Sequence, residues 1–474
     1  MNTQLILQIF IGLCLLALII SLFFDKWDYL LSSIAVVFIS IIVSTFLIPL
    51  ETPEDFIGII LAVDWEVICF LICIFTIVEI LKQINFFDAI AKRIVNKFYY
   101  APRKLFYAMC ITSTLIAALI QDLSVAVIFV PIAIEACRKM KISAVPYLFG
   151  ITICINIAST LTPFGSAENL IIASHFNLPV YWFLVYLGVY FVVVTAITLL
   201  LLDRILLKKY IEQRNLILEN NIQGTEKNHS PEIQNHSDDG INVRSSETDG
   251  DAGSKSLLKI QIERNVFIRN LIGLIFFVIL LGIIPQIIIT GPIGLILFVL
   301  LNPIKQNGDK KRPDVSYFLR KIDPKLIYFF ICLFIMVYML DLIGLVQKIE
   351  ELIESWSTHN IIVLSIEIIV ITSVLSGFLD NAPLTIMLIP IISKIITHSN
   401  IPANPVLMSF TLGINLGNFL PQGAACDMMT LELARKNNVE GFTYKSLTIV
   451  GGLFALLHVA LGVGYVSIFS VLFP

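Results

Sequence analysis

The chain has 474 residues, of which 57% are hydrophobic and 14% are charged, whereas an ordinary soluble domain carries roughly 25% charged residues. Its formal net charge is −3, and apolar runs near the ~20 residues needed to cross a bilayer recur along it. These values exclude a secreted, cytosolic or nucleic-acid-binding protein and predict an all-α, multi-pass protein of the cell membrane, with the lipid bilayer as a partner. The eight cysteines lie almost wholly in apolar runs without a CxxC pattern, so we expect neither disulfides nor a cysteine-ligated metal.

The apolar runs predict about ten transmembrane helices, at 4–24, 29–49, 61–82, 145–175, 180–203, 265–285, 288–304, 323–345, 404–436 and 443–472. The first run has no basic segment before it and no cleavage site after it, which favours a retained span over a signal peptide. Two further stretches, 104–138 and 361–397, are each interrupted at their centre by polar residues. Their halves are only about 15 residues long, short for a crossing, so we expect two re-entrant helical hairpins rather than four ordinary crossings.

Residues 205–263 form the one long hydrophilic stretch, rich in Asn, Ser, Asp, Glu and Gly. Such a segment cannot bury enough apolar surface to fold alone. We therefore expect a disordered linker between an N-terminal membrane half, 1–204, and a C-terminal half, 264–474. Lys and Arg gather in the loops on the linker's side, which predicts a cytoplasmic linker and external N- and C-termini.

The two halves resemble each other at a constant offset of 259 residues. At this offset Asp64 falls on Asp323, Gln121-Asp122 on Asp380-Asn381, Pro131 on Pro390 and Asn156 on Asn415. Matched Asp, Pro and Asn are harder to attribute to composition than matched Leu or Ile. Five crossings per half is an odd number, so the second copy would run upside down. Two inverted repeats with interrupted helices are typical of secondary transporters, whose site lies near the bilayer midplane.

The centres of the two predicted hairpins carry the first candidate ion- or substrate-binding residues. These are Asp122 and Ser124 in the first hairpin and Asp380, Asn381 and Thr385 in the second. Each centre precedes a half-helix whose free N–H groups and positive dipole end would point into the protein. Helix capping is the structural alternative. A charge inside a membrane is costly, however, so intramembrane acids are functional candidates.

The predicted spans 145–175 and 404–436 are interrupted by Pro and Gly, which unwind a helix and expose its carbonyls. Their candidate ligands are Asn156, Ser159, Thr160, Thr162 and Gly165 in the first span and Asn415, Asn418, Gly423 and Asp427 in the second. Unwound carbonyls with side-chain oxygens suit a hard cation. For sodium we single out Asp122, Asp380, Asn156 and Asn415. Two kinked helices without a ligand are the alternative.

Other polar residues in the apolar runs receive structural interpretations. Asp64 and Asp323 stand at predicted helix starts, where capping is the expected role. His458 in the last span is expected to be packed and hydrogen-bonded rather than a proton relay.

The segments Leu375-Ser-Gly-Phe-Leu-Asp-Asn-Ala-Pro-Leu-Thr385 and Asn156 to Asn169 are similar to motifs of a known superfamily. The sequence resembles the ion transporters that include arsenite permeases, sodium/proton antiporters of the NhaD type, citrate transporters and sodium/dicarboxylate symporters, over about 55–203 and 265–472. The resemblance implies two inverted repeats, each with a re-entrant hairpin and a broken helix, in a homodimer that moves its transport domain as an elevator. It also implies an ATPase subunit as a partner, as in arsenite permeases. The Ser-Asn-Thr tips of dicarboxylate symporters read Gln121-Asp122-Leu and Asp380-Asn381-Ala here, which argues against dicarboxylate binding.

The four motif segments contain Asp122, Glu168, Asp380 and Asp427 but no Lys, Arg or His. A proton and a sodium ion can compete for a buried carboxylate, because desolvation favours the protonated form and a nearby cation the ionised one. We therefore expect a cation-coupled secondary transporter of antiporter type, with sodium or protons as coupling ions, no cofactor and no enzymatic activity.

Two alternatives remain open at this stage. The first is a permease for an anionic solute or an oxyacid, of the arsenite, citrate or dicarboxylate type. The second, more distant, is an intramembrane aspartyl enzyme, although its Tyr-Asp and Gly-x-Gly-Asp signatures are absent. The sequence has no P-loop, so a primary pump would need a separate ATPase.

Overall fold

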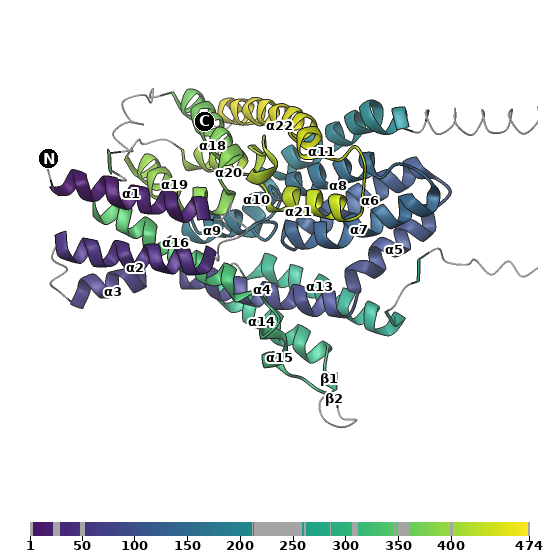
Figure 1. Cartoon of the computed structure of the whole chain (residues 1–474), viewed down its shortest axis with the longest axis horizontal. Coiled ribbons are helices and arrows are strands. Elements are labelled where there is room, and N and C mark those ends of the chain that lie inside the picture. Colours follow the sequence, from purple (N-terminus) through teal and green to yellow (C-terminus); the bar gives the residue numbers. More distant parts are fainter. Residues whose placement is uncertain are drawn as a thin grey trace, which may run out of the picture.

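Apolar helices make up nearly all of the computed structural model (Figure 1). It describes residues 3–21, 29–47, 53–210, 212, 258–259, 262–284, 286–305, 311–345, 347–348, 360–398 and 402–472. Most of the predicted linker, 205–263, lies outside the described residues. The helix before it continues to Tyr210, however, so the first residues assigned to the linker are helical. The sequence shows why, since Ile205, Leu206 and Leu207 extend the apolar run.

The N-terminal half contains eleven α-helices and one π-helix among the described residues. In chain order they are α1 (Thr3–Ser21), α2 (Tyr29–Leu47), α3 (Pro53–Leu61), α4 (Trp65–Gln83), α5 (Phe86–Phe98), α6 (Pro102–Ala117), α7 (Asp122–Met140), α8 (Val145–Ala158), α9 (Ala167–His175), α10 (Val180–Tyr186), α11 (Gly188–Leu202) and the π-helix η1 (Asp203–Leu207). The breaks between α6 and α7 and between α8 and α9 fall where polar residues interrupt the apolar runs.

The C-terminal half is also mainly helical. Its described elements are α13 (Arg264–Ile283), α14 (Ile287–Leu301), β1 (Ile304–Lys305), β2 (Lys311–Arg312), α15 (Val315–Leu319), α16 (Pro324–Leu342), α18 (Ile361–Phe378), α19 (Asn381–His398), α20 (Ala403–Leu416), the 3₁₀-helix η2 (Pro421–Gly423), α21 (Ala425–Lys436) and α22 (Tyr444–Leu472). The two-residue strands pair antiparallel and are the only β-structure in the described part of the chain. The prediction of an all-α fold is therefore confirmed apart from this short pairing.

Helix caps explain several of the boundaries. Asp64 accepts a 3.0 Å hydrogen bond from the Val67 N–H at the start of α4, and Asp323 accepts one of 2.9 Å from the Lys325 N–H at the start of α16. Both predicted caps are confirmed. Asn85 adopts a left-handed conformation (φ 57°) between α4 and α5, and these two helices are bent by 51°. Asn tolerates this conformation better than most residues do.

The sequence did not predict α3, α5 and α15, because they are short or amphipathic. The predicted half-length of about 15 residues for the two hairpins was also too short, since α7 has 19 residues and α18 and α19 have 18 each. Helices continue past the apolar run because terminal Arg and Lys side chains, such as those of Arg138 and Lys139, extend to water.

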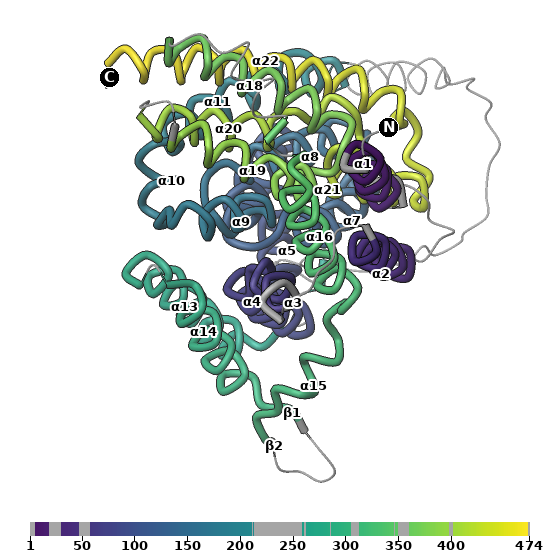
Figure 2. The backbone as a smooth tube through the Cα atoms, turned by 90° about the vertical axis from the view of Figure 1, so that its left-hand side faces the viewer, coloured from purple at the N-terminus to yellow at the C-terminus, as the bar shows by residue number. Residues whose placement is uncertain are grey.

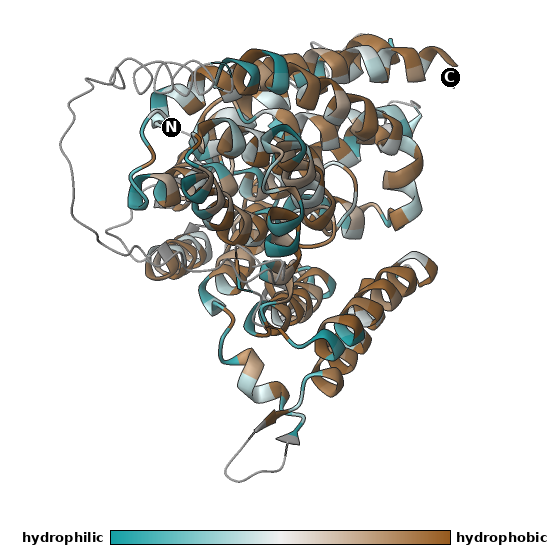
Figure 3. Ribbon diagram, turned by 90° about the vertical axis from the view of Figure 1, so that its right-hand side faces the viewer, coloured by the Kyte–Doolittle hydropathy of each residue, from teal (hydrophilic) through white to brown (hydrophobic). Residues whose placement is uncertain are grey.

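Five described helices are long and apolar enough to cross a membrane, or six if the bent α4–α5 pair is one span. Two of the five are α18, half of a predicted hairpin, and the 29-residue α22. Five shorter apolar helices, including α8, α14 and α19, fall below this length. Large apolar side chains such as Phe38, Leu300 and Leu456 lie exposed on the outer surface, where lipid would cover them. In Figure 3 the ribbons of α13, α14 and α22 are mostly brown, the colour of hydrophobic residues. The protein is thus a multi-helix membrane protein, while the predicted ten crossings and re-entrant hairpins stay predictions.

The helices pack in corresponding pairs. In the centre, α6 packs on α8 and α18 on α20, while α7 contacts α21 and α19 contacts α9. At the periphery, α14 packs on α4 and α2 on α16. Figure 2 shows α13 and α14 as a pair beside α4. Glycines permit the closest of these contacts, because a Cβ on Gly417 would lie 2.1 Å from the Ser373 carbonyl oxygen.

The two ends of the helix bundle hold different parts of the chain. The start of α1 and the end of α22 lie at one end, whereas α11 ends and α13 begins at the other (Figure 1). The described chain therefore passes from one end to the other within each half.

Candidate functional site

Four interruptions of the helices meet in the centre of the molecule. They are the α6–α7 break, the α18–α19 break, the unwound segment 159–166 between α8 and α9, and the segment 417–424 between α20 and α21. We call α6–α7 and α18–α19 the first and second hairpin-like pairs, and α8–α9 and α20–α21 the two broken helices. Helix α7 contacts α21 and α19 contacts α9, so each hairpin-like pair contacts the broken helix of the other half. All fourteen predicted binding residues lie in or next to these segments.

The first break ends with Gln121, and Asp122 is the first residue of α7. The Asp122 carboxylate accepts a 2.7 Å hydrogen bond from the Leu123 N–H. The backbone N–H of Ser124 donates to the Gln121 carbonyl at 3.1 Å. Both Asp122 and Ser124 are partly buried.

The second break is built around a cap. Asp380 accepts a 3.1 Å hydrogen bond from the Ala382 N–H, which confirms the capping role weighed for this residue. Asn381 begins α19, and its Oδ1 lies 2.6 Å from the Ser376 hydroxyl oxygen at the end of α18. The Thr385 hydroxyl donates to the Asn381 carbonyl at 2.8 Å and is buried, so Thr385 serves its own helix.

The first unwound segment is held by side chains that satisfy its backbone. Thr160 donates to the Ile157 carbonyl at 2.8 Å, and Thr162 donates to the Ala118 carbonyl in the α6–α7 break. Gly165 lies against the Ala117 and Ala158 carbonyl oxygens, where a Cβ would be within 3.3 Å of both. The geometry ties this segment to the first hairpin-like pair.

Asn169 on α9 stabilises the same segment, although the sequence did not single it out as a ligand. Its side-chain amide donates to the Ser159 carbonyl and, at 3.2 Å, to the Thr162 carbonyl. Its Oδ1 accepts a 2.7 Å hydrogen bond from Asn415 Nδ2. Asn169 is completely buried, so this one side chain joins both broken helices.

The second unwound segment contacts the first through its amides. Asn415 also donates to the Thr411 carbonyl of its own helix at 2.7 Å, and the Ser166 hydroxyl lies 3.4 Å from Asn415 Oδ1. Asn418 Nδ2 donates to the Asn415 carbonyl at 3.4 Å. Gly423 approaches the backbone of α18, where a Cβ would lie 2.6 Å from the Ser376 carbonyl oxygen.

Asp427 follows this segment in the first turn of α21 and is 3% exposed. Asn156 Nδ2 donates to Asp427 Oδ1 at 2.9 Å, and the Cys426 thiol donates to Asn156 Oδ1 at 2.7 Å. On the other side of the centre, Asn381 Nδ2 donates to Glu168 Oε1 at 3.4 Å. Each of these bonds links one half of the chain to the other.

The four carboxylates of the motif segments lie in one region. Asp122 is close enough to Asp380, Glu168 and Asp427 to interact electrostatically with each of them. Within the described residues, none of the four forms an ion pair with Lys, Arg or His. Glu168 and Asp427 are buried, and Asp122 and Asp380 are partly buried. Carboxylates removed from water without a cationic partner are costly, so such a region favours protons or cations.

The carboxylates are nevertheless spread out. In the described part of the chain, no three His, Cys, Asp or Glu side chains come close enough to hold a metal ion together. A cation would therefore have to take most of its ligands from amide and carbonyl oxygens, as hard cations do in proteins.

A small cavity of about 20 Å³ lies beside the second unwound segment. Its polar lining comes from Asn156, Asn415, Asn418, Asp427 and His458. Asn418 Oδ1 is buried and accepts no hydrogen bond from the described residues. The amide is oriented by its Nδ2 donation to a carbonyl, so the unpaired atom is the oxygen. The cavity has the size of one water molecule or one small ion.

His458 also fits its predicted structural role, because its Nε2 lies 2.8 Å from the Thr198 hydroxyl and the residue is buried. The structure thus groups Asn156, Asn415, Asn418 and Asp427 around the cavity, while Asp122 and Asp380 lie at the neighbouring helix starts. It does not bring the four predicted sodium ligands together through direct contacts. Asn169, Cys426 and Ser376 are additional residues of this region; polar character in an apolar helix was their only sequence signal.

The sequence is similar to a family of membrane transporters and to several of its relatives. The sequence model of the citrate transporter family matches residues 15–413 and, in a second match, 287–471. A "46 kDa membrane protein" of Mycobacterium leprae is 20% identical over 88% of this chain and 91% of its own length. An uncharacterized transporter of Mycobacterium tuberculosis is 20% identical over 85% of this chain and 86% of its own. A Dictyostelium discoideum protein named as the transporter arsB is 25% identical over 24% of this chain and 20% of its own length.

Proposed function

The chain belongs to the citrate transporter family of membrane transporters, and we propose that it is a secondary active transporter coupled to sodium ions or protons. One observation carries this proposal: Asp122, Glu168, Asp380 and Asp427 meet among interrupted helices without a cationic partner in the described residues. A carboxylate that exchanges a proton for a metal cation gives the coupling that an antiporter needs.

The helix boundaries support a transport site between two inverted repeats. Helix α4 begins at Trp65 and α16 at Pro324, and α7 begins at Asp122 and α19 at Asn381, both at the 259-residue offset. The packing pair α6–α8 within the first half has a counterpart in α18–α20 of the second, and the α7–α21 contact between the halves has a counterpart in α19–α9. A pair of equivalent halves that exchange contacts around a centre is the arrangement that alternating access requires.

The cavity beside Asp427 offers a place for the coupling cation. Asp427 supplies a carboxylate and Asn418 an unpaired amide oxygen, and Asn156 and Asn415 stand next to them. Oxygen donors of this kind suit sodium. Asp122 and Asp380 then act as the proton- or cation-exchanging acids on the other side of the unwound segments.

A second candidate follows from the family description. A citrate-type anion or an oxyacid could be the solute, bound at the starts of α7 and α19, where helix dipoles favour anions. Four carboxylates would repel a bare polyanion, so such a solute would have to enter together with cations or protons. Coupling to cations or protons is therefore part of both proposed functions, ion exchange and transport of an anion or oxyacid.

The decisive experiment compares two aspartates with the same capping geometry. Asp380 and Asp323 each accept a hydrogen bond from the backbone N–H two residues later, but only Asp380 lies in the carboxylate region. Asn caps a helix about as well as Asp does. In liposomes with imposed sodium and pH gradients, we expect Asp380→Asn to lower ion-coupled flux at least about tenfold, which corresponds to ~1.4 kcal/mol.

Asp323→Asn is the matched control and should leave flux near the parental value. Adding citrate or arsenite to one side, one at a time, separates exchange of ions alone from solute transport. Near-parental flux in Asp380→Asn, with normal folding and reconstitution, would refute carboxylate coupling at this position.

A further inference from the structure

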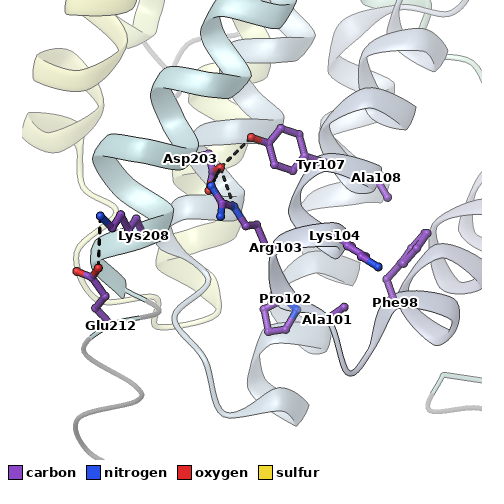
Figure 4. Close-up of a pocket in the computed structure, with 10 residues that line it drawn as sticks. All are labelled: Phe98, Ala101, Pro102, Arg103, Lys104, Tyr107, Ala108, Asp203, Lys208 and Glu212. Atoms are coloured by element: carbon purple, nitrogen blue, oxygen red, sulfur yellow. Dashed lines mark hydrogen bonds and ion pairs between the residues drawn. The ribbon is translucent and has the colours of Figure 1, made fainter.

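A large cavity lies away from the four interrupted segments. It has a volume of about 920 Å³ and is formed between the end of α5, the first half of α6, and η1 with the residues that follow it (Figure 4). Its walls are mainly apolar and include Phe98, Ala101, Pro102 and Ala108. Such a volume is in the range of small-molecule sites in proteins.

One charged cluster fixes the polar edge of this cavity. Arg103 donates from Nε to both carboxylate oxygens of Asp203, at 2.9 and 2.7 Å, and its Nη2 forms an ion pair with Asp203. Tyr107 donates to Asp203 Oδ2 at 2.8 Å. The Asp203 side chain is 3% exposed, whereas that of Arg103 is 62% exposed. The guanidinium group is therefore held on one side and open on the other.

The backbone explains how a carboxylate comes to lie inward at this position. Asp203 begins the π-helical turn η1, which interrupts the apolar helix that started at α11. A π-turn shifts the register of the side chains that follow, and such turns are frequent at functional sites. Here the turn places Asp203 against α6 rather than toward the surroundings.

Cations are in excess around the cavity. Asp203 forms an ion pair with Arg103. Lys208 Nζ lies 3.7 Å from Glu212 Oε1, and this pair is weak because both side chains are exposed. Lys104 also lines the cavity and forms no ion pair with an acid in the described part of the chain. Arg103, Lys104 and Lys208 lie along the rim of the cavity, with Lys104 and Lys208 on either side of Arg103 (Figure 4), and the apolar wall stands beside them.

The surroundings indicate where this anion comes from. Leu200 and Ile205, on the same helix as Asp203, are more than half exposed and form part of the lipid-facing surface. The cavity thus lies where the apolar surface meets a row of Lys and Arg side chains. That boundary is the depth of phospholipid headgroups, and basic pockets between membrane helices bind anionic ones.

We propose that this cavity binds one anionic phospholipid, with its phosphate at Arg103, Lys104 and Lys208 flanking it along the rim, and its glycerol and upper acyl chain against Phe98, Ala101 and Ala108. A free phosphate ion would use only the polar rim. The lipid would cover the apolar wall and stabilise the contact between α6 and η1.

Two kinds of variant of the full-length purified protein test this proposal. Lys104→Gln/Lys208→Gln removes the cations that no buried acid holds, and Ala108→Trp fills the apolar wall but keeps every charge. Binding of phosphatidylglycerol and of phosphatidylcholine is measured by native mass spectrometry, and inorganic phosphate is added in a separate arm. We expect the parent to retain phosphatidylglycerol at least tenfold better than phosphatidylcholine, and both variants to lose that preference.

Lys436→Gln/Lys445→Gln is the matched control, because it removes two exposed cations outside the cavity. It should keep the phosphatidylglycerol preference. Equal retention of the two lipids by the parent, or an equal loss in the control, would overturn the proposal. So would full competition by inorganic phosphate together with an unaffected Ala108→Trp variant, since that result would show an ion site at the rim.

Discussion

Asn156 Nδ2 donates a 2.9 Å hydrogen bond to Asp427 Oδ1, which joins α8 of the first half to α21 of the second across 271 residues of sequence. The Cys426 sulfur lies 3.5 Å from the same carboxylate oxygen, but its one proton goes to Asn156 Oδ1 at 2.7 Å. Asn156 therefore both orients Asp427 and satisfies part of its charge, beside the small cavity that both residues line.

A double-mutant cycle should measure this relationship. Asn156→Ala removes the best donor of a buried carboxylate, so we expect it to lower the free energy of unfolding by about 1.5–3 kcal/mol. In an Asp427→Ala background the same change should cost clearly less, with a coupling of about 1 kcal/mol or more. Denaturant or thermal unfolding in detergent gives the four values. Additive effects would show that the two side chains do not interact.

We expect substitution of Asn169 to lower the stability of the protein strongly, although its side chain is uncharged. Asn169→Ala leaves the Ser159 and Thr162 carbonyls of the unwound segment without their donor. Each unsatisfied buried group costs about 1–3 kcal/mol, so we expect a large fall in the unfolding temperature. Asn169→Asp keeps the acceptor for Asn415 but loses the donors. If Asn169→Asp matched the parent, the donation to the carbonyls would be unimportant.

The close packing of α18 on α20 depends on Gly417. In Gly417→Ala the new Cβ would lie 2.1 Å from the Ser373 carbonyl oxygen and within 2.8 Å of two further backbone atoms, so one helix must shift. Overpacking of this kind costs about 1–3 kcal/mol. Gly464→Ala is the control, because a Cβ there meets no atom within 4 Å. Comparison of their unfolding temperatures checks the prediction, and equal values would contradict it.

The orientation in the membrane is testable at two exposed positions. The charge distribution places Tyr100, which is 94% exposed, on the cytoplasmic side, and the exposed Asn177, beyond α9, on the outside. In a background without the eight native cysteines, Tyr100→Cys should react with a membrane-impermeant thiol reagent only from the inside. Asn177→Cys should react only from the outside. The reverse pattern would invert the proposed topology, including the cytoplasmic linker.

The sequence alone determined where the apolar helices run and where they break. Apolar runs, Pro and Gly act locally, so the interruptions at Gln121-Asp122 and at Asp380-Asn381 could be placed, and Asp64 and Asp323 could be assigned as caps. The family also followed from local motifs. The same reasoning did not predict the amphipathic helix α5, because charged residues on one face interrupt its apolar residues in the sequence.

The tertiary structure alone decided which polar groups meet. No local signal pairs Asn156 with Asp427, Asn169 with Asn415 or Arg103 with Asp203, because these partners lie 100 to 271 residues apart. Their contacts depend on how whole helices pack, and the same polar residue in an apolar helix can cap, bridge or bind. The small cavity at Asn418 and the large one at Arg103 arise in the same way, since a cavity is the space that several packed helices leave between them.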